Sequence, residues 1–224
     1  MTDVSRALAI EGVRFFGEMT ASVSHDIKNV LAIINENAGL LKDMVDLSAR
    51  GTPLAPERLA DLAQSISRQV ARGDRVVKKI NGFAHSADRP VETVDVSETV
   101  AVVASLADRL IAMQGQPPRI EVPESPVTAT TNRFFLENII WACLGRSIRA
   151  CNPNQAITVR VEKSGETVRI RFLGLTAEKF DEGEAFPAVR EEMVCRMMNA
   201  QVFVDAHREA ITLVLVAVPP GSAH

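Results

Sequence analysis

The amino-acid sequence predicts an α+β fold, in which a long antiparallel helical hairpin forms a dimeric four-helix bundle and precedes a small α/β two-layer sandwich. Apolar residues recur in steps of three and four from residue 5 to residue 83, which is the spacing of amphipathic helices. Beyond residue 90, short alternating segments typical of strands take turns with helical ones. We therefore expect a helical domain at residues 1–90, an α/β domain at 91–219 and a tail at 220–224.

The first predicted helix covers residues 5–48, and no proline interrupts it. Gly51 and Pro53 predict where it ends, because glycine favours a helix stop and proline forbids continuation. The stripe that we expect to form its buried side consists of Phe16, Met19, Val23, Ile27, Val30, Ile34, Ala38, Leu41 and Val45.

The second predicted helix follows after a short loop and runs back along the first. Its expected stripe consists of Leu59, Leu62, Ile66, Val70, Val77, Ile80 and Phe83. A lone hairpin of this length leaves part of both stripes in water, because each helix touches only one neighbour. Pairing of two hairpins buries both stripes, so we expect a homodimer. The alternative is that the hairpin packs against the rest of its own chain.

The second half of the chain begins with residues 86–98, which break the helical period and predict a linker. Ser97 and Asn132 are the expected N-caps of two helices, and Ser164-Gly165-Glu166 predicts a hairpin turn. The expected order is helix 97–114, strand 119–122, helix 132–150, strands 156–163 and 167–174, helix 187–199, and strands 201–206 and 210–218. This order predicts a sheet of about five strands with three helices on one face.

Several sulfur-containing and apolar residues fall at core spacing on these predicted helices. We expect them to serve packing: Cys143, Cys151, Val189, Met193, Val194, Met197 and Met198.

Composition excludes several classes of protein. The 224 residues carry a formal net charge of −3, with 46% hydrophobic and 4% aromatic residues, so we expect a globular chain without nucleic acid as partner. No uninterrupted apolar run is long enough to cross a membrane, and the N-terminus lacks the pattern of a signal peptide. Three cysteines without a CxxC pair predict free thiols in a reducing cytoplasm.

One short segment, residues 24–29, carries the side chains expected of a chemical site. His25 lies off the predicted stripe, Asp26 is its neighbour, and Asn29 follows four residues later on the same helical face. A carboxylate beside an exposed imidazole can hold one tautomer and make a ring nitrogen more nucleophilic. The simpler interpretation of this spacing is a solvated histidine.

The run GEMTASVSHDIKNVLAIINENAGLL, residues 17–41, resembles the phosphoacceptor box of sensor histidine kinases. Residues 91–110 and 119–150 resemble the entry and the strand-plus-helix unit of that family's ATP-binding domain. The resemblance implies that His25 is the phosphoacceptor, that Asp26 is the base that takes its proton, and that Asn29 orients a water for dephosphorylation of a response regulator. It further implies a partner receiver domain carrying Mg²⁺, and an upstream histidine kinase as a further partner.

The ATP-binding half departs from the family pattern. Arg146 stands where the family has an Asn that holds Mg²⁺ and phosphates. Residues 175–186 lack the family's Asp-x-Gly-x-Gly motif, and residues 187–198 contain no glycine to approach a phosphate. We therefore expect no bound nucleotide, cofactor or metal. Arg146 and Arg149 are expected on the polar face of their helix, and Glu178 with residues 181–184 is expected to be a solvated acidic connection.

Three functions are consistent with these residues. The first is a histidine-kinase-like phosphotransferase that carries a phosphoryl group on His25, exchanges it with receiver domains and lacks ATP-dependent autokinase activity. In this role it resembles bacterial histidine phosphotransferases. The second is a phosphatase of a phosphorylated response regulator, acting through Asp26 and Asn29. The third is a pseudokinase scaffold that docks receiver domains without turnover.

Overall fold

The computed structural model describes residues 3–107, 111, 116–152, 155–182, 185–205, 207 and 209–216. Its elements are α1 (Asp3–Ala49), α2 (Pro56–His85), β1 (Glu92–Asp95), α3 (Val96–Leu106), β2 (Arg119–Glu121), β3 (Thr128–Thr131), α5 (Arg133–Ala150), β4 (Thr158–Ser164), β5 (Thr167–Leu173), α6 (Ala177–Asp181), α7 (Val189–Met197), β6 (Ala200–Val204) and β7 (Ala210–Val216). They form two compact units, Glu18–Phe83 and Met1–Gly17 with Ala84–His224. The predicted α+β class, with long N-terminal helices before a small α/β sandwich, is confirmed.

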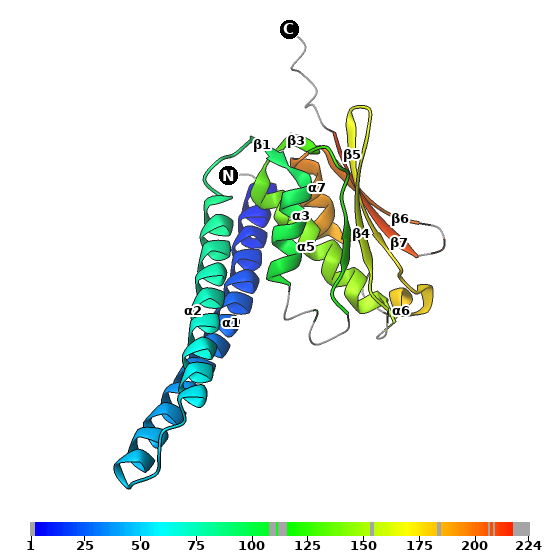
Figure 1. The fold of residues 1–224 in the computed structure, drawn as a ribbon. Helices are drawn as coiled ribbons and strands as arrows, with labels where there is room; N and C mark the ends of the chain where they lie inside the picture. The colour runs from blue at the N-terminus through cyan, green and yellow to red at the C-terminus, as the bar shows by residue number, and fades with distance from the viewer. Residues whose placement is uncertain are drawn as a thin grey trace. The chain divides into compact units, whose positions relative to one another are not determined.

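The unit Glu18–Phe83 is the predicted antiparallel hairpin, formed by most of α1 and α2 (Figure 1). Helix α1 ends at Ala49, and Gly51 then adopts a φ of 94°, a conformation that glycine reaches without steric cost. Pro56 begins α2, where a missing N–H costs nothing because the first helical N–H groups lack partners within the helix. The predicted end of the first helix near Gly51 is thus confirmed.

The predicted stripe on α1 is wrong in part, because it combines two stripes that lie side by side. The buried stripe within this unit contains Met19, Val23, Val30 and Asn37. A second stripe, displaced by one residue along the helix, consists of Ile27, Leu31, Ile34, Ala38, Leu41 and Val45, and its members are half-buried or exposed. On α2 the predicted core residues Val70 and Val77 are likewise exposed, whereas Val76 is buried.

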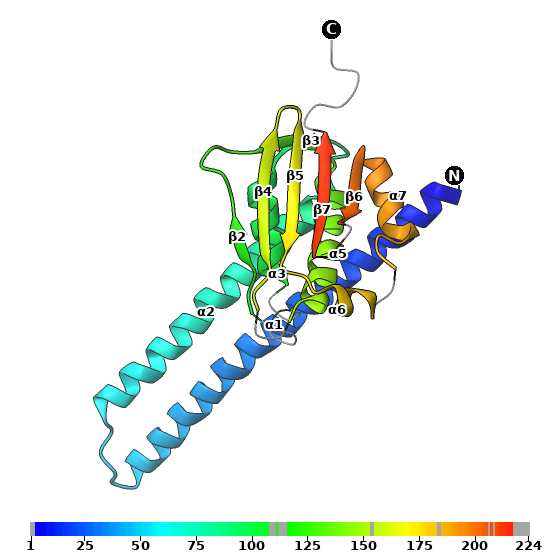
Figure 2. The same cartoon turned by 90° about the vertical axis from the view of Figure 1, so that its right-hand side faces the viewer.

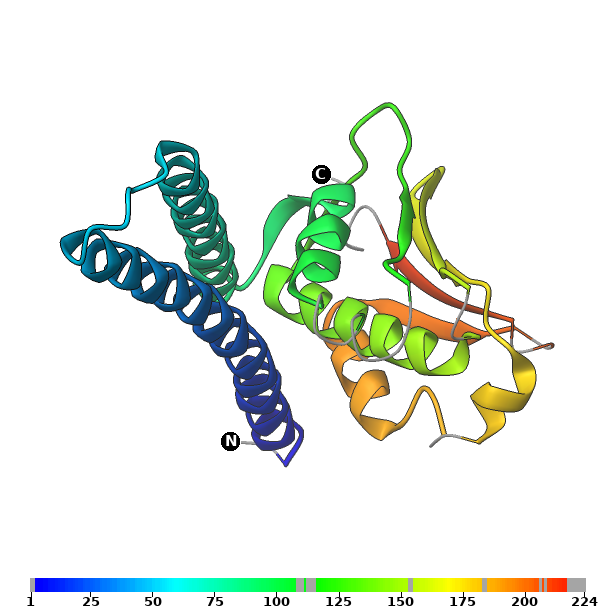
Figure 3. The ribbon, with the colours of Figure 1, turned by 60° about the horizontal axis from the view of Figure 1, so that its bottom comes forward.

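The α/β unit contains a five-stranded sheet in the order β2-β4-β5-β7-β6, as predicted in number of strands. Strand β2 is parallel to β4, and the other neighbours are antiparallel. Helices α3, α5 and α7 lie on one face of this sheet, which confirms the predicted two layers (Figures 1 and 3). Alternate residues of β4, β5 and β7 enter the core between the layers, such as Val168, Ile170 and Phe172 of β5.

A second, two-stranded sheet was not predicted. Strand β1 pairs antiparallel with β3, and it lies within the segment that the sequence analysis assigned to a linker. The N-cap of α3 is Asp95 rather than the predicted Ser97, since the Asp95 carboxylate accepts hydrogen bonds from the backbone N–H groups of Ser97 and Glu98. Asn132 caps α5 as predicted, through the N–H of Phe135. Helix α3 ends at Leu106, and the predicted continuation to residue 114 falls largely outside the described residues.

The first turns of α1 belong to the α/β unit and not to the hairpin unit. Leu8 joins the core of the α/β unit, and the ring of Phe15 meets the ring of Phe134 edge to face with centroids 5.4 Å apart. Glu11 also lies 3.7 Å from the Arg190 guanidinium. Phe15, and not the predicted Phe16, is therefore the buried aromatic residue of this segment.

Helix α7 begins at Val189 and buries less than expected. Val194, Cys195 and, just beyond the helix, Met198 are buried, but Val189 and Met197 are exposed, contrary to prediction. The acidic segment was expected to be a solvated loop, yet its first residues form helix α6, which buries Phe180. Residues 183 and 184 lie outside the described residues.

Two expectations from composition concern membranes and thiols. No helix among the described residues is long and apolar enough to cross a membrane. All three cysteines are free and buried, as predicted.

Candidate functional site

Helix α1 places His25, Asp26 and Asn29 together within the hairpin unit. A continuous helix puts residues four apart on one face, and the amide Nδ2 of Asn29 lies 3.3 Å from Nδ1 of His25. The Asp26 carboxylate is 3.8 Å from the same ring nitrogen. The His25 side chain is 47% exposed and that of Asp26 17%, so the imidazole faces solvent beside a largely covered carboxylate. The three predicted site residues therefore lie together.

The two ring nitrogens of His25 differ in their surroundings. Nδ1 faces both Asn29 and Asp26, whereas Nε2 makes no hydrogen bond to any residue that the structure describes. When the Asn29 amide donates to Nδ1, the ring proton is on Nε2 and that nitrogen has no free lone pair. When the proton is on Nδ1 and faces Asp26, the Nε2 lone pair is free and exposed. The tautomer therefore decides whether the exposed ring nitrogen has a free lone pair.

A second exposed histidine–carboxylate pair was missed by sequence reasoning. Nδ1 of His85, at the end of α2, lies 2.8 Å from a carboxylate oxygen of Asp88, a shorter contact than that of His25 with Asp26. Both side chains are well exposed. The three-residue spacing of this pair crosses the end of α2, so no helical periodicity in the sequence indicates it. His85 is therefore the appropriate comparison for any test of His25.

Side chains of α5 and α6 pack on one another within the α/β unit. Arg146 was expected on a polar helix face but is buried, and its guanidinium lies 4.3 Å from the centre of the Phe180 ring. The same guanidinium donates a hydrogen bond to the Phe180 carbonyl. The Lys179 ammonium donates to the Cys151 carbonyl at 3.0 Å, which further ties α6 to the end of α5. Arg149 is exposed, as predicted.

A buried acid near the start of α5 was also not predicted. Glu137 is fully buried, and its carboxylate accepts a hydrogen bond from Arg133 Nε at 3.0 Å. Burial raises the pKa of Glu137, and hydrogen bonds from Ser86 and Arg133 oppose that rise. In the sequence, the spacing of four residues between Arg133 and Glu137 is typical of an exposed ion pair on a helix. Only the packing of α5 shows that the Glu137 side chain is buried.

No model of a protein family matches the sequence, and a search of curated proteins found no match. The Acinetobacter baumannii histidine kinase AdeS is similar in structure over 87% of this chain and 98% of its own, with 14% identity and a TM-score of 0.44. The histidine kinase ThkA, in complex with the response regulator protein TrrA, is similar over 98% of this chain and 65% of its own, with 15% identity and a TM-score of 0.48. A bacterial phosphotransferase is similar over 89% of this chain and 94% of its own, with 14% identity and a TM-score of 0.43. These three similar structures are thus two histidine kinases and a phosphotransferase.

Proposed function

We propose that this chain is a phosphotransfer protein of two-component signalling, which carries a phosphoryl group on His25 and exchanges it with the receiver domain of a response regulator. The observation that carries this proposal is the asymmetry of the His25 ring: Nδ1 faces Asp26 and Asn29, and Nε2 is exposed and free of described partners. An imidazole held in this way has one nitrogen to attack phosphorus and another to keep its proton. The resemblance of residues 17–41 to a phosphoacceptor box supports the same role.

The transfer balances as a single displacement at phosphorus. The Nε2 lone pair attacks the phosphorus of the receiver's aspartyl phosphate, a P–N bond forms, and the P–O bond to the aspartate breaks. The leaving carboxylate keeps the electron pair. The ring must carry its proton on Nδ1 during attack, and Asp26 faces that proton and stabilises the positive charge that develops. The Mg²⁺ expected for this step belongs to the receiver domain.

The exposed amide of Asn29 supports a second candidate, dephosphorylation of the receiver. An amide one helical turn from the phosphoacceptor can orient a water in line with the aspartyl phosphate instead of the imidazole. Relay and phosphatase activity then differ in the nucleophile, which is a nitrogen in the first case and a water in the second.

A transfer assay separates these candidates. The chain is incubated with a receiver domain that carries ³²P on its aspartate, and both proteins are followed over time. We expect an acid-labile, base-stable label on this chain, as a phosphohistidine gives. Asn29→Ala should leave that label intact, because the variant removes only the amide that competes for Nδ1, but should slow net loss of phosphate to water. No label on this chain, with loss of phosphate that depends on Asn29, would support the phosphatase; no change in either protein would support a scaffold.

We also infer that the chain does not bind ATP. The support is the contact of Arg146 with Phe180, which fills the space beside α5, together with the missing glycine-rich segments. A ligand at a hundred times its dissociation constant stabilises a protein by about 2.7 kcal/mol, which a melting curve resolves. ATP with Mg²⁺ should therefore leave the melting temperature unchanged. A clear rise, or label on His25 from ATP alone, would contradict this inference and indicate a kinase.

The proposed functional form is a homodimer through the hairpin, in the reducing cytoplasm. The second stripe on α1 supports dimerisation, because Leu31 and Val45 are 57% and 52% exposed in the single chain. Val70 and Val77 of α2 add apolar surface to the same unit. Three buried free thiols fit a compartment that keeps cysteine reduced.

A further inference from the structure

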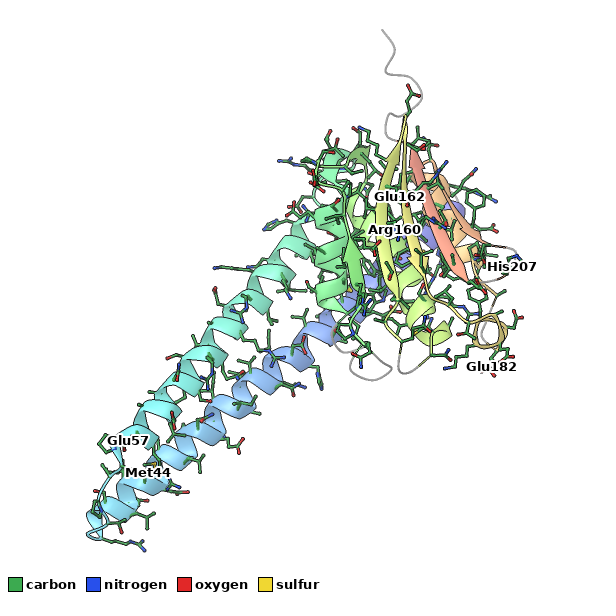
Figure 4. The ribbon with its side chains drawn as sticks, turned by 45° about the vertical axis from the view of Figure 1, so that its right-hand side comes forward. Met44, Glu57, Arg160, Glu162, Glu182 and His207 are labelled. Atoms are coloured by element: carbon green, nitrogen blue, oxygen red, sulfur yellow. The ribbon has the colours of Figure 1, made fainter. Side chains whose placement is uncertain are left out.

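One face of the five-stranded sheet is not covered by any described helix, and Figure 2 shows it toward the viewer. Strand alternation decides which side chains lie there. Val159 and Val161 of β4 are buried under the helices, so Arg160 between them lies on the opposite, open side, as Figure 4 also shows. The strand register then aligns one row across the open side: Glu121, Arg160, Arg171, Thr212 and Phe203.

The positive charge on this face is only partly neutralised by carboxylates of the same face. Arg160 pairs with Glu121 at 2.6 Å and lies 3.9 Å from Glu162. Arg171 stands directly across from Arg160 on the next strand, an arrangement of like charges that weakens a sheet. No carboxylate among the described residues pairs with Arg171 or with Arg169, although the whole chain has a net charge of −3.

Apolar side chains continue the same face beyond the arginines. Val214 of β7 lies across from Arg169, and Phe203 on the edge strand β6 is 51% exposed. Arginine and aromatic residues are the types enriched at the centres of protein interfaces. We define the arginine face as Arg119, Arg160, Arg169, Arg171, Val214 and Phe203.

We propose that the arginine face docks an acidic protein segment whose carboxylates are followed by apolar side chains. A second copy of this chain does not fit, because it would bring arginine against arginine. Nucleic acid fits less well, because Glu121 and Glu162 lie among the arginines and would face phosphates. This surface lies within the α/β unit and is independent of His25.

The spacing of strands sets the pattern of the expected segment. From β4 to β6 there are three strand intervals, or about 14 Å at the usual spacing. An extended peptide that crosses the strands covers this distance in about four or five residues. The carboxylates and the apolar side chains of the partner should therefore be separated by about that many positions.

The test uses a fluorescein-labelled ten-residue peptide with four glutamates in its first half and Leu, Val and Phe in its second. The controls are a scrambled peptide of the same composition and a single-stranded oligonucleotide of similar charge. Fluorescence anisotropy should show the ordered peptide binding the full chain at least about tenfold more tightly than either control, an affinity ratio that simple attraction of charge does not give.

Variants locate the binding on the arginine face. Arg169→Glu/Arg171→Glu should weaken binding of the ordered peptide by more than about tenfold. The variant Arg169→Gln/Arg171→Gln should weaken binding of the ordered peptide by a smaller factor. Because it introduces no negative charge, it serves as a second variant in case the glutamate variant misfolds. The matched control Arg68→Glu/Arg72→Glu makes the same change of charge at exposed positions of α2 and should stay within about twofold. Equal binding of ordered and scrambled peptides, equal loss in the control variant, no binding at about 1 mM peptide, or an oligonucleotide that binds as tightly would each overturn the proposal.

Discussion

The hairpin unit and the α/β unit bury their apolar side chains to very different extents. In the α/β unit, one continuous core extends from Val94 to Leu215 between the sheet and its helices. In the hairpin unit, more large apolar side chains among the described residues are exposed than buried, with Leu31 and Val77 as examples. The α/β unit therefore buries most of its apolar side chains within one chain, whereas the hairpin leaves a larger share of its apolar side chains exposed.

The two units also differ in whether their notable polar side chains are buried or exposed. In the α/β unit the buried Arg146 packs on Phe180, whereas the His25 side chain is exposed on the hairpin. Closed packing leaves little room for a ligand, and an exposed ring is accessible to another protein.

The largest expected effect is loss of the dimer. Leu31→Asp places a carboxylate in the proposed interface without a partner, and burying one leucine contributes about 1.5–3 kcal/mol. Light scattering at micromolar concentration should give the mass of a dimer for the wild type and of a monomer for this variant. Ala32→Asp, at an exposed position about 100° further round the helix, should remain dimeric. A monomeric wild type would show that the exposed stripe is only surface.

The next effect concerns the closed core of the α/β unit. Ile170→Ala removes a fully buried side chain of β5 and should lower the free energy of unfolding by about 2–5 kcal/mol, without changing the dimer. Val122→Ala, at an exposed position of the same unit, should cost less than about 0.5 kcal/mol. Denaturant titration measures both. Similar costs for the two variants would mean that this core is not closed as described.

A smaller, pH-dependent effect is expected at Glu137. Because burial raises the pKa of its carboxyl in the folded state, the protonated form is favoured by folding. This contribution is present below the ordinary pKa of a glutamate and is lost as pH rises through the higher folded value. As pH rises through this range, the unfolding free energy of the wild type should therefore fall relative to that of Glu137→Gln. Denaturant titration at several pH values measures the difference. Parallel curves for the two proteins would contradict the argument.

The smallest effect is on thiol reactivity. Burial raises the pKa of Cys195 to about 12, with Glu191 and Glu192 adding to the rise, and burial raises that of Cys143 well above its ordinary value. A thiol reagent at neutral pH should therefore label none of the cysteines in the native chain and all three in denaturant. Met197→Cys places a thiol at an exposed position and should react at once. Rapid labelling of the wild type would show that α7 opens.

The strands and the helix hairpin could be predicted because their signals are local. Apolar segments bounded by prolines or turn residues predicted all five strands of the main sheet, and Gly51 with Pro53 marked the end of α1. Strand β1 was missed because a four-residue strand between polar residues has little alternation to detect, and only its pairing with β3 reveals it. The merged stripe on α1 has a similar cause: residues 27 and 30 both follow residue 23 at helical spacing, so sequence alone does not separate two adjacent stripes.

The candidate site could likewise be predicted only where its contacts are local along the chain. His25 and Asn29 are joined by the i, i+4 geometry of one helix, so their contact follows from sequence. The pairing of His85 with Asp88 depends on how the chain turns after α2, and the contact of Arg146 with Phe180 joins residues 34 positions apart. Neither contact leaves a periodic signal in the sequence.

The most direct test of phosphoryl transfer compares two histidines in one experiment. His25→Gln and His85→Gln are each incubated with a ³²P-labelled receiver domain, and the labelled residue is identified by peptide mapping at alkaline pH. His85 is the stricter control because its carboxylate contact is the shorter of the two. We expect His25→Gln to abolish the label and His85→Gln to leave it unchanged, with the label mapped to residues 17–41. A label that survives in His25→Gln and disappears in His85→Gln would contradict the account.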